Sequence, residues 1–280
     1  MKISIYRKII SKTGLVISFA VLLTFSLFPL YWVFLTSIKT KKDWLTLPVK
    51  FIFKPTLEHW KNVLLSSDFI QYYKNSLIIA ISVACVILVV GTMAAYSLAR
   101  GKYKFRDNIS FFILSQKMMP AVAIVLPIYL IASRLNAIDH IETLIFINVA
   151  FNLPLAVWML KGYIQSLSLS IEEAALIDGC SQFGAFIKIG IPQIVPGIMS
   201  TILLIFIYTF NEFFFALILS GTKARPVSVA VMNFLPTGVR GTMFGEAAAA
   251  SILIMIPTLI FAIFMQRYLV KGISLGAVKE

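Results

Sequence analysis

The chain has 280 residues, of which 59% are hydrophobic and 13% are charged, and its net charge is +13. Its mean hydropathy is +0.91. These values exclude an ordinary soluble globular domain and predict an integral membrane protein. Of the 2 cysteines, Cys85 falls in a predicted span and Cys180 in a loop, so a disulfide framework is also excluded.

Six stretches free or nearly free of charged side chains are long enough to cross a bilayer, which takes about 20 residues. These predicted spans cover roughly residues 14 to 36, 77 to 99, 110 to 133, 142 to 160, 194 to 219 and 247 to 266. Lys117 interrupts the third span. Because no second soluble domain is visible, we expect residues 1 to 280 to form a single all-α polytopic membrane domain.

The distribution of basic residues bears on the orientation of these spans. The first span is not followed by a small-residue cleavage site and is expected to be retained. With six spans, both termini share one side of the membrane with the loops after spans two and four. Basic residues are spread almost evenly over the two sides, but RGKYKFR, Arg100 to Arg106, packs four into one turn. We therefore predict cytoplasmic termini, with the positive charge at the membrane surface rather than on nucleic acid.

Between spans four and five, residues 168 to 192 form an acidic, alanine-rich stretch that does not fit its apolar surroundings. Ser170 and Glu173 match the capping box, which predicts a helix that begins at Ile171. Gly179 is suited to the left-handed residue that closes a helix. The pattern predicts a short helix on the cytoplasmic face.

A second short helix is predicted after this glycine turn. Ser181 is expected to cap the helix, and Pro192 is expected to separate it from span five. The loop is thus predicted to be a helix, a glycine turn and a helix.

The composition of the first loop helix favours one of two functions. A helix that lies on the lipid surface usually carries Lys and Arg, whereas this helix carries Glu172, Glu173 and Asp178, which anionic lipid repels. Ala174 and Ala175 leave one side thin enough to enter a cleft in another protein. An interfacial helix is the alternative, but the acidic face favours docking.

The spacing of this stretch, E-A-A, three residues, G and then I-x-x-P, resembles the EAA loop of the membrane subunits of ABC importers. The matching positions are Glu173, Ala174, Ala175, Gly179, Ile189 and Pro192. Four further stretches are similar to the carbohydrate-importing, MalG-type branch of the binding-protein-dependent transport family. They are Asn75-Ser76, AAYSLAR (Ala94 to Arg100), NEFFFALIL (Asn211 to Leu219) and LVKGISLGAVK (Leu269 to Lys279).

The resemblance implies a permease subunit that moves a sugar, expected to be a di- or oligosaccharide, across the cytoplasmic membrane. It also implies two ATP-binding cassette subunits, a related second permease subunit and an extracytoplasmic solute-binding protein. ATP and magnesium would bind to the ATPase subunits, and no G-x-x-x-x-G-K-[ST] loop occurs in this chain. No cofactor or metal is expected on the chain itself. The implied contacts with the ATPase are Glu172, Glu173, Ala174, Ala175, Asp178, Gly179 and Phe183.

The sequence also bears on other function classes. The only histidines are His59 and His140, and no H-E-x-x-H or G-x-S-x-G motif occurs, so an enzyme is not expected. An ion-coupled secondary transporter is the first alternative, but its spans would offer only Lys117 and Glu212 as ionisable groups, which could also pair. An ABC importer for a polyol or glycerol phosphate is the second.

Four residues are candidates for the translocation pathway. A carboxylate deep in a span costs about 2.5 to 3.5 kcal/mol, which makes Glu212 a candidate unless it reaches water at the end of span five. Tyr208 and Asn211 lie nearby in the sequence, with hydrogen bonds between helices as their alternative role. Lys117 is the fourth, with snorkelling or pairing inside the bundle as the alternative.

Overall fold

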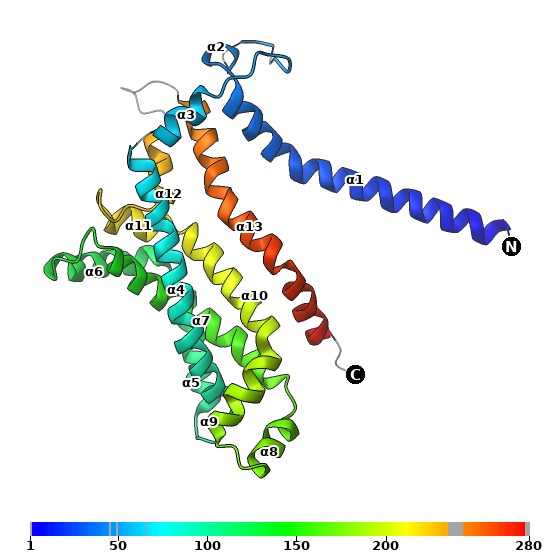
Figure 1. Cartoon of the computed structure of the whole chain (residues 1–280), viewed down its shortest axis with the longest axis vertical. Coiled ribbons are helices and arrows are strands. Elements are labelled where there is room, and N and C mark those ends of the chain that lie inside the picture. Colours follow the sequence, from blue (N-terminus) through cyan, green and yellow to red (C-terminus); the bar gives the residue numbers. More distant parts are fainter. Residues whose placement is uncertain (1, 45, 49, 66, 235–242, 278–280) are drawn as a thin grey trace. The chain divides into compact units, whose positions relative to one another are not determined.

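The computed structural model describes residues 2–44, 46–48, 50–65, 67–234 and 243–277. This part of the chain consists of helices and connecting segments without a strand, which confirms the predicted all-α fold (Figure 1). The chain forms two compact units, and each is described by itself below. Unit 1 joins Met1–Ser67 to Val231–Leu253, and unit 2 joins Asp68–Ala230 to Ile254–Glu280.

Unit 1 consists of three N-terminal helices and a later segment of the chain. Its elements are α1 (Lys2–Ile38), α2 (Lys41–Trp44), α3 (Glu58–Leu65), η3 (Val231–Phe234) and the beginning of α13 (Phe244–Ala277). Residues 14–31 of α1, its most hydrophobic part, are all exposed, whereas Leu35 and Ser37 near the end of the helix are buried. The exposed part therefore presents apolar side chains on all sides.

Within the described part of the chain, five helices are long and apolar enough to cross a membrane. They are Gly14–Ile38, Asp68–Arg100, Ile141–Gln165, Gln182–Phe210 and Phe244–Gln266. A sixth span results if the bent pair Arg106–Met118 and Ala121–Arg134 is counted as one. The prediction of about six spans is therefore confirmed, although two of them differ in form from the prediction.

The third predicted span is not one straight helix. It consists of α5 (Arg106–Ser115), η1 (Gln116–Met118) and α6 (Ala121–Arg134), with a bend of 88° between the two halves. Met119 and Pro120 at the break have extended ψ angles of 126° and 128°. The prolyl ring pushes the preceding residue out of the helical region, which ends the first half of the span.

The fifth predicted span begins earlier than expected. α9 (Gln182–Ala185), the π-helical turn η2 (Phe186–Gly190) and α10 (Ile191–Phe210) follow one another without a break. The prediction that Pro192 separates the loop from the span is wrong. Pro192 has no N–H to donate to the preceding turn, but that turn is the wider π turn η2, and the helical backbone continues through the proline.

The same predicted span also ends earlier than expected, at Phe210. A short helix, α11 (Phe214–Leu219), follows the break. The Glu212 carboxylate accepts the backbone N–H groups of Phe215 at 2.7 Å and Ala216 at 3.0 Å. Glu212 therefore caps the start of α11, and this role accounts for a carboxylate within the predicted fifth span.

The core of unit 2 is formed mainly by α4 (Ser67–Arg100), α7 (Ile141–Gln165) and α10. Leu98 of α4, Leu160 of α7 and Ile198 of α10 belong to one buried apolar cluster. A second cluster adds side chains of α6, α11 and α12 (Val227–Ala230). Because lipid is as apolar as these side chains, close packing and polar contacts rather than hydrophobic burial hold such helices together.

One glycine shows how close this packing is. A Cβ atom at Gly197 of α10 would collide with the ring of Tyr163 on α7. Only glycine lets the backbone of α10 approach the ring this closely. The contact fixes α10 against the end of α7 from which the loop with the candidate site continues.

Candidate functional site

The acidic loop stretch forms the helix α8 (Leu169–Ile177) in unit 2. The helix begins two residues before the predicted start, with Ser168 as its N-cap residue. The predicted capping box is wrong, because no side chain caps this end. The hydroxyl of Ser170 instead lies 2.7 Å from that of Ser168. The start of α8 must therefore be held by other contacts.

The end of α8 matches the prediction. Gly179 has a positive φ of 87°. The N–H of Gly179 donates to the carbonyl of Leu176 at 3.1 Å, and the N–H of Cys180 donates to that of Ala175 at 3.0 Å. These two bonds are the Schellman arrangement that closes a helix on a left-handed glycine.

The next helix also begins as predicted. The backbone N–H of Gly184 donates to the Ser181 hydroxyl at 3.1 Å, so Ser181 caps α9. Phe183 is exposed, whereas Phe186 is buried and its ring stacks on that of Tyr96 of α4, with 4.0 Å between the ring centroids. The loop is thus anchored to α4 through Phe186.

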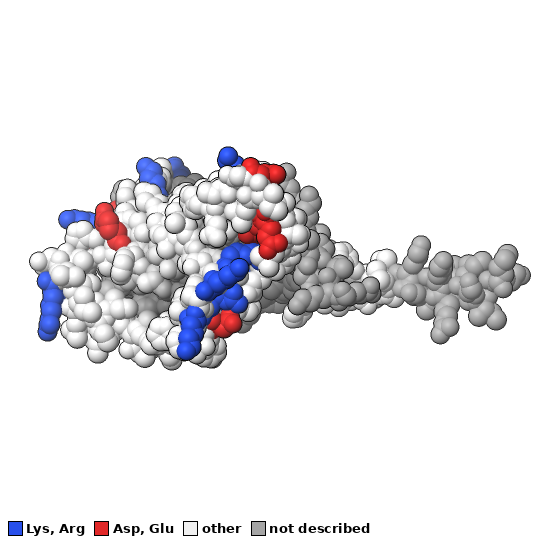
Figure 2. All heavy atoms as spheres, turned by 90° about the horizontal axis from the view of Figure 1, so that it is seen from below, with Lys and Arg blue, Asp and Glu red and all other residues white. Residues whose placement is uncertain are grey.

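α8 has one inner and one outer face. Glu172 and Ala175 are its only buried residues, at 7% and 4% exposure. The outer face carries the remaining predicted contact residues, all of which are exposed: Glu173, Ala174, Asp178, Gly179 and, just beyond, Phe183. Figure 2 shows the molecule from the end that carries α8, where acidic and basic side chains stand among uncharged residues.

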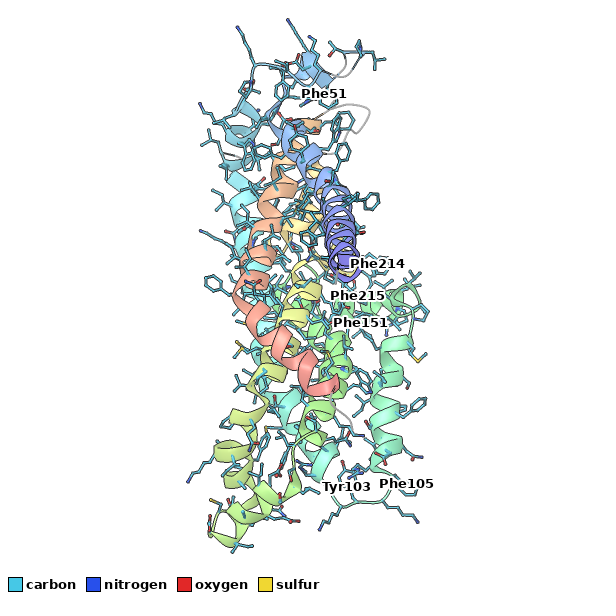
Figure 3. The ribbon with its side chains drawn as sticks, turned by 90° about the vertical axis from the view of Figure 1, so that its right-hand side faces the viewer. Phe51, Tyr103, Phe105, Phe151, Phe214 and Phe215 are labelled. Atoms are coloured by element: carbon cyan, nitrogen blue, oxygen red, sulfur yellow. The ribbon has the colours of Figure 1, made fainter. Side chains whose placement is uncertain are left out.

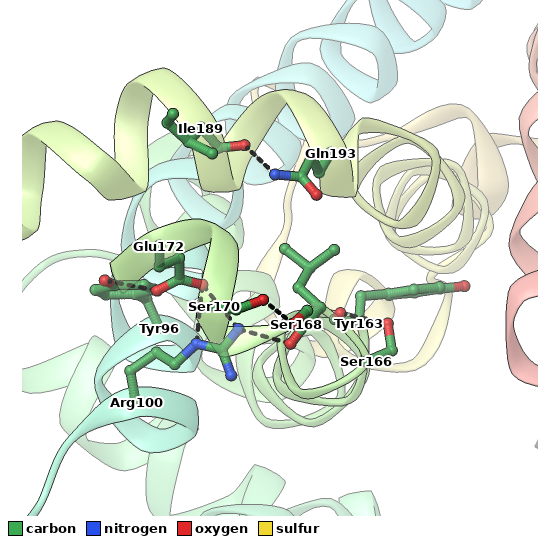
Figure 4. A network of polar contacts seen from close by, with 10 residues as sticks. Tyr96, Arg100, Tyr163, Ser166, Ser168, Ser170, Glu172, Ile189 and Gln193 are labelled. Atoms are coloured by element: carbon green, nitrogen blue, oxygen red, sulfur yellow. Dashed lines mark hydrogen bonds and ion pairs between the residues drawn. The ribbon is translucent and has the colours of Figure 1, made fainter. Parts of the chain in front are cut away.

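Glu172 lies on the inner face because Arg100, the last residue of α4, binds it. Nε and one terminal nitrogen of Arg100 donate to Oε1 of Glu172 at 2.9 and 2.7 Å, and the Tyr96 hydroxyl donates to Oε2 at 3.3 Å (Figure 4). The same terminal nitrogen donates to the carbonyl of Leu167 at 3.1 Å. We call this set, Tyr96, Arg100, Leu167 and Glu172, the Arg100 clamp. The sequence prediction missed it, because Arg100 and Glu172 are 72 positions apart.

The predicted pathway residues divide into two groups. The Lys117 ammonium donates to the carbonyl of Phe151 at 3.2 Å and to the side-chain oxygen of Asn152 at 3.1 Å. It also lies 3.9 Å from the centroid of the Phe151 ring and 5.7 Å from that of Tyr208. Lys117 and Glu212 therefore do not pair, since Lys117 binds neutral groups and Glu212 caps α11.

Tyr208 and Asn211 are exposed near the end of α10, Tyr208 by 47%. Three positions apart, they lie on the same side of the helix. Asn152, which sequence reasoning missed, links this end of α10 to Lys117 because its amide nitrogen lies 3.5 Å from the Thr209 hydroxyl. Lys117 thus lies close to Tyr208, and Asn211 follows on the same side of α10, whereas Glu212 caps α11.

The aromatic residues near this cluster are packed rather than free. The rings of Phe151 and Phe215 meet edge to face at 5.3 Å, and Phe214 lies beside Phe215 at 6.0 Å (Figure 3). Phe215 is 2% exposed and belongs to the apolar core. Most of these rings therefore stabilise the α7–α11 contact.

A second polar anchor, also missed from the sequence, fixes the loop between α11 and α12. The Asp139 carboxylate accepts the backbone N–H groups of Gly221, Thr222, Lys223 and Ala224 at 2.7 to 3.1 Å. Partial burial raises the pKa of the Asp139 carboxyl, but these four hydrogen bonds outweigh burial and hold its pKa below the ordinary value. Asp139 is therefore ionised throughout the physiological range.

Residues 87–275 match the family described as "Binding-protein-dependent transport system inner membrane component". This match covers more than half of the chain and includes α8 with its acidic face. The chain belongs to this family. The resemblance drawn from the EAA pattern is thereby confirmed, and the protein is a permease subunit, the membrane component of such a system rather than an enzyme.

Relatives of this permease extend the match to nearly the whole chain. The "Trehalose/maltose transport system permease protein MalG" of Thermococcus litoralis is 34% identical and covers 98% of this chain and 99% of its own length. The "Probable ABC transporter permease protein y4oR" of Sinorhizobium fredii is 36% identical over 90% of each chain.

A solved structure supports the fold. The structure of a bacterial ABC transporter for the import of the acidic polysaccharide alginate aligns with a TM-score of 0.77 at 21% identity, over 90% of this permease and 94% of that chain. At this identity the likeness concerns the fold alone.

Proposed function

We propose that this permease imports a sugar, of di- or oligosaccharide size, and that two separate ATPase subunits drive it through α8. ATP and magnesium bind to those subunits in this proposal, and no phosphate-binding loop occurs in the permease itself. A related second permease subunit and an extracytoplasmic solute-binding protein complete the assembly. The permease lies in the cytoplasmic membrane with both termini, and hence α8, on the cytoplasmic side.

The observation that carries the proposal is the division of α8 into two faces. Its inner face is bound to α4 by an ion pair, and its outer face presents Glu173, Ala174 and Asp178. Small and acidic groups on a projecting helix fit a groove in a partner protein better than they fit anionic lipid. Since the inner face of α8 is bound to α4, a partner that binds the outer face can transmit its motion to the permease.

Exposed apolar surface supports a second permease subunit. The central part of α1 has no buried residue, and its large side chains, such as Phe25 at 80% exposure, cover all sides of the helix. Lipid satisfies such a surface in part, and a membrane partner satisfies it with better packing. A complex of two permease subunits is therefore the assembly that we propose.

The substrate class rests on the relatives and on the partly buried Lys117 with the exposed Tyr208 and Asn211. A relative 34% identical over almost the entire chain carries trehalose and maltose in its name. Tyrosine and asparagine side chains are suited to sugars, because a ring packs on the apolar face of a pyranose while the amide binds hydroxyl groups. We therefore place the translocation pathway along this end of α10.

The test is uptake by proteoliposomes that contain the permease with its partner subunits and binding protein. Labelled trehalose and maltose are compared with mannitol and glycerol 3-phosphate, with and without ATP in the ATPase compartment. We expect ATP-dependent uptake of a sugar that persists when ionophores collapse the ion gradients. Uptake that needs an ion gradient but no ATP would indicate a secondary transporter, and uptake of only the polyol or the phosphate ester would refute the sugar assignment.

A further inference from the structure

The structure assigns to the Arg100–Glu172 pair the role of a rigid connection between two helices, so that α4 moves whenever α8 is displaced. This inference rests on the proposed docking of α8 to an ATPase. It makes Arg100 and Glu172 positioning residues that transmit motion inside the permease, whereas the sequence prediction counted Glu172 among the ATPase contacts.

Few side chains of α8 are buried against the rest of unit 2. Of its nine residues only Glu172 and Ala175 are buried, and Ala175 contributes a single methyl group. The start of the helix has no side-chain cap. α8 also lies against α9 and η2, which follow it in the chain, and the charged pair is the contact that attaches it to α4.

The Arg100 clamp fixes both the position and the direction of α8. Two nitrogens of Arg100 reach the Glu172 carboxylate, and one of them also reaches the carbonyl of Leu167, just before the helix begins. Arg100 thereby binds both α8 and the segment that precedes it. A planar guanidinium bound at several points resists rotation as well as separation. The side chains are only 11% and 9% exposed, so water screens the pair little.

The Arg100–Glu172 pair connects α8 to the long helix α4. Arg100 ends α4, which runs as one helix of 34 residues. Nearer the start of α4, Asn75 donates to the carbonyl groups of Lys223 and Arg225. The neighbouring Ser76 hydroxyl accepts the N–H of Val227. The two attachment regions are roughly 37 Å apart along the helix axis, at 1.5 Å per residue. α4 therefore links α8 rigidly to the segment that follows α11.

The segment reached in this way borders the break between α10 and α11. The Ser228 hydroxyl donates to the carbonyl of Glu212 at 2.6 Å, and Glu212 caps α11. Tyr208 and Asn211 lie directly before this break. A displacement of α4 thus acts on the end of α10 where we place the pathway. Rigid helices joined at polar contacts are the kind of element that transmits such a shift.

The experiment uses the full complex in nanodiscs, with the native Cys85 and Cys180 replaced by alanine. A cysteine at Ala174 reports docking through its cross-link to the ATPase subunit, and in a separate protein a cysteine at Tyr208 reports pathway motion through its ATP-dependent reaction with a thiol reagent. Both are measured in Glu172→Gln, Arg100→Gln and the exchanged pair Arg100→Glu/Glu172→Arg. The control is Lys161→Gln, which breaks a pair with the 73% exposed Asp107 that links α7 to α5.

We expect the single clamp variants to keep the cross-link but to lose at least four-fifths of the ATP-dependent change at Tyr208. The exchanged pair should restore a substantial part of it, and Lys161→Gln should behave like the parent protein. A full ATP response in the single variants would overturn the inference. So would loss of the cross-link together with the response, because the pair would then only hold α8 in its docking position.

Hydrogen exchange separates this inference from the proposed function. In the permease alone, the amides of residues 169–177 should exchange at least tenfold faster in Glu172→Gln than in the parent, and the exchanged pair should slow them again. Unchanged exchange would contradict the clamp whether or not an ATPase docks. Absence of the Ala174 cross-link in the parent complex, with exchange as expected, would contradict the proposed docking instead.

Discussion

Nδ1 of His59 lies 3.0 Å from Oε1 of Glu246, and the two side chains are only 2% and 1% exposed. Nε2 of His59 lies 2.9 Å from the carbonyl oxygen of Lys39, which can only accept a hydrogen bond. His59 must therefore carry a proton on Nε2, and a second proton must lie between Nδ1 and the carboxylate. This pair joins α3 to the first turn of α13 within unit 1.

Replacement of His59 by alanine should destabilise unit 1 severely. Among the described residues, the change leaves the buried Glu246 carboxylate with only the Asn62 amide, 3.3 Å away, as a side-chain donor. Breaking a buried ion pair on one side typically costs about 3 to 5 kcal/mol. Thermal unfolding of the purified protein should show a marked loss of stability. Glu246→Gln is the matched comparison, because glutamine can still donate to Nδ1, and an equal loss in both variants would contradict this account.

Replacement of Gly179 by leucine should impair transport without preventing membrane insertion. No described atom lies within 4 Å of a Cβ at this position, so within the permease itself the cost comes from the positive φ of 87°. A left-handed conformation costs an L-residue about 1 to 2 kcal/mol, which favours opening of the turn that closes α8. Uptake by membranes with equal amounts of permease measures the effect.

Two other variants calibrate the Gly179 result. Asparagine tolerates the left-handed region better than leucine, so Gly179→Asn should retain more uptake. Gly162 in α7 also has free space around its Cβ position but lies in a regular helix, so Gly162→Ala should be neutral or slightly stabilising. Equal uptake by all three variants would mean that the turn does not matter for coupling.

The sequence was most informative where a structural feature depends on neighbouring residues. Charge-free runs indicated the spans, and Gly179 and Ser181 identified the turn and the following cap, because each signal acts within one helical turn. The bend before Pro120 also has a local cause, yet the apolar pattern continues across it and hid the break.

Contacts between distant positions escaped sequence reasoning. Neither Arg100 with Glu172 nor Asp139 with the loop 221–224 follows from a local pattern. The capping box failed for a related reason, since tertiary contacts of Arg100 with Leu167 and Glu172 fix where α8 begins. Propensity and capping signals are weak compared with such an ion pair.

Replacement of Asp139 by asparagine should loosen the loop between α11 and α12. An amide oxygen replaces two carboxylate oxygens that accept four N–H groups, so loss of stability of at least roughly 1 kcal/mol is expected at neutral pH. Thermal unfolding of both proteins over a range of pH measures it.

The pH dependence of this contribution has a definite sign. Because the folded pKa of Asp139 lies below the ordinary value of 3.8, its contribution is fully present above that value and is lost as the pH falls through the folded pKa. The difference between wild type and Asp139→Asn should be constant from pH 8 to pH 5 and shrink only in stronger acid. A difference that vanishes between pH 7 and pH 5 would contradict the assignment.

The proposed orientation predicts where introduced cysteines react. A cysteine at Ile52, a residue 94% exposed in the loop after α2, should react with a membrane-impermeant thiol reagent added outside intact cells. A cysteine at the exposed Gln182 should react only after the membrane is permeabilised. The parent for both is the chain without native cysteines. The opposite pattern would place α8 outside the cell and remove it from any cytoplasmic ATPase.

Cross-linking from the two faces of α8 tests the central claim most directly. Ala174 is exposed and the adjacent Ala175 is 4% exposed, so cysteines at these neighbouring positions report the outer and the inner face of one helix. In the assembled complex, we predict that a short bifunctional reagent joins a cysteine at Ala174, but not one at Ala175, to the ATPase subunit, and that ATP changes the yield because the groove moves. Equal labelling of both positions without any product containing the ATPase would contradict the docking of α8.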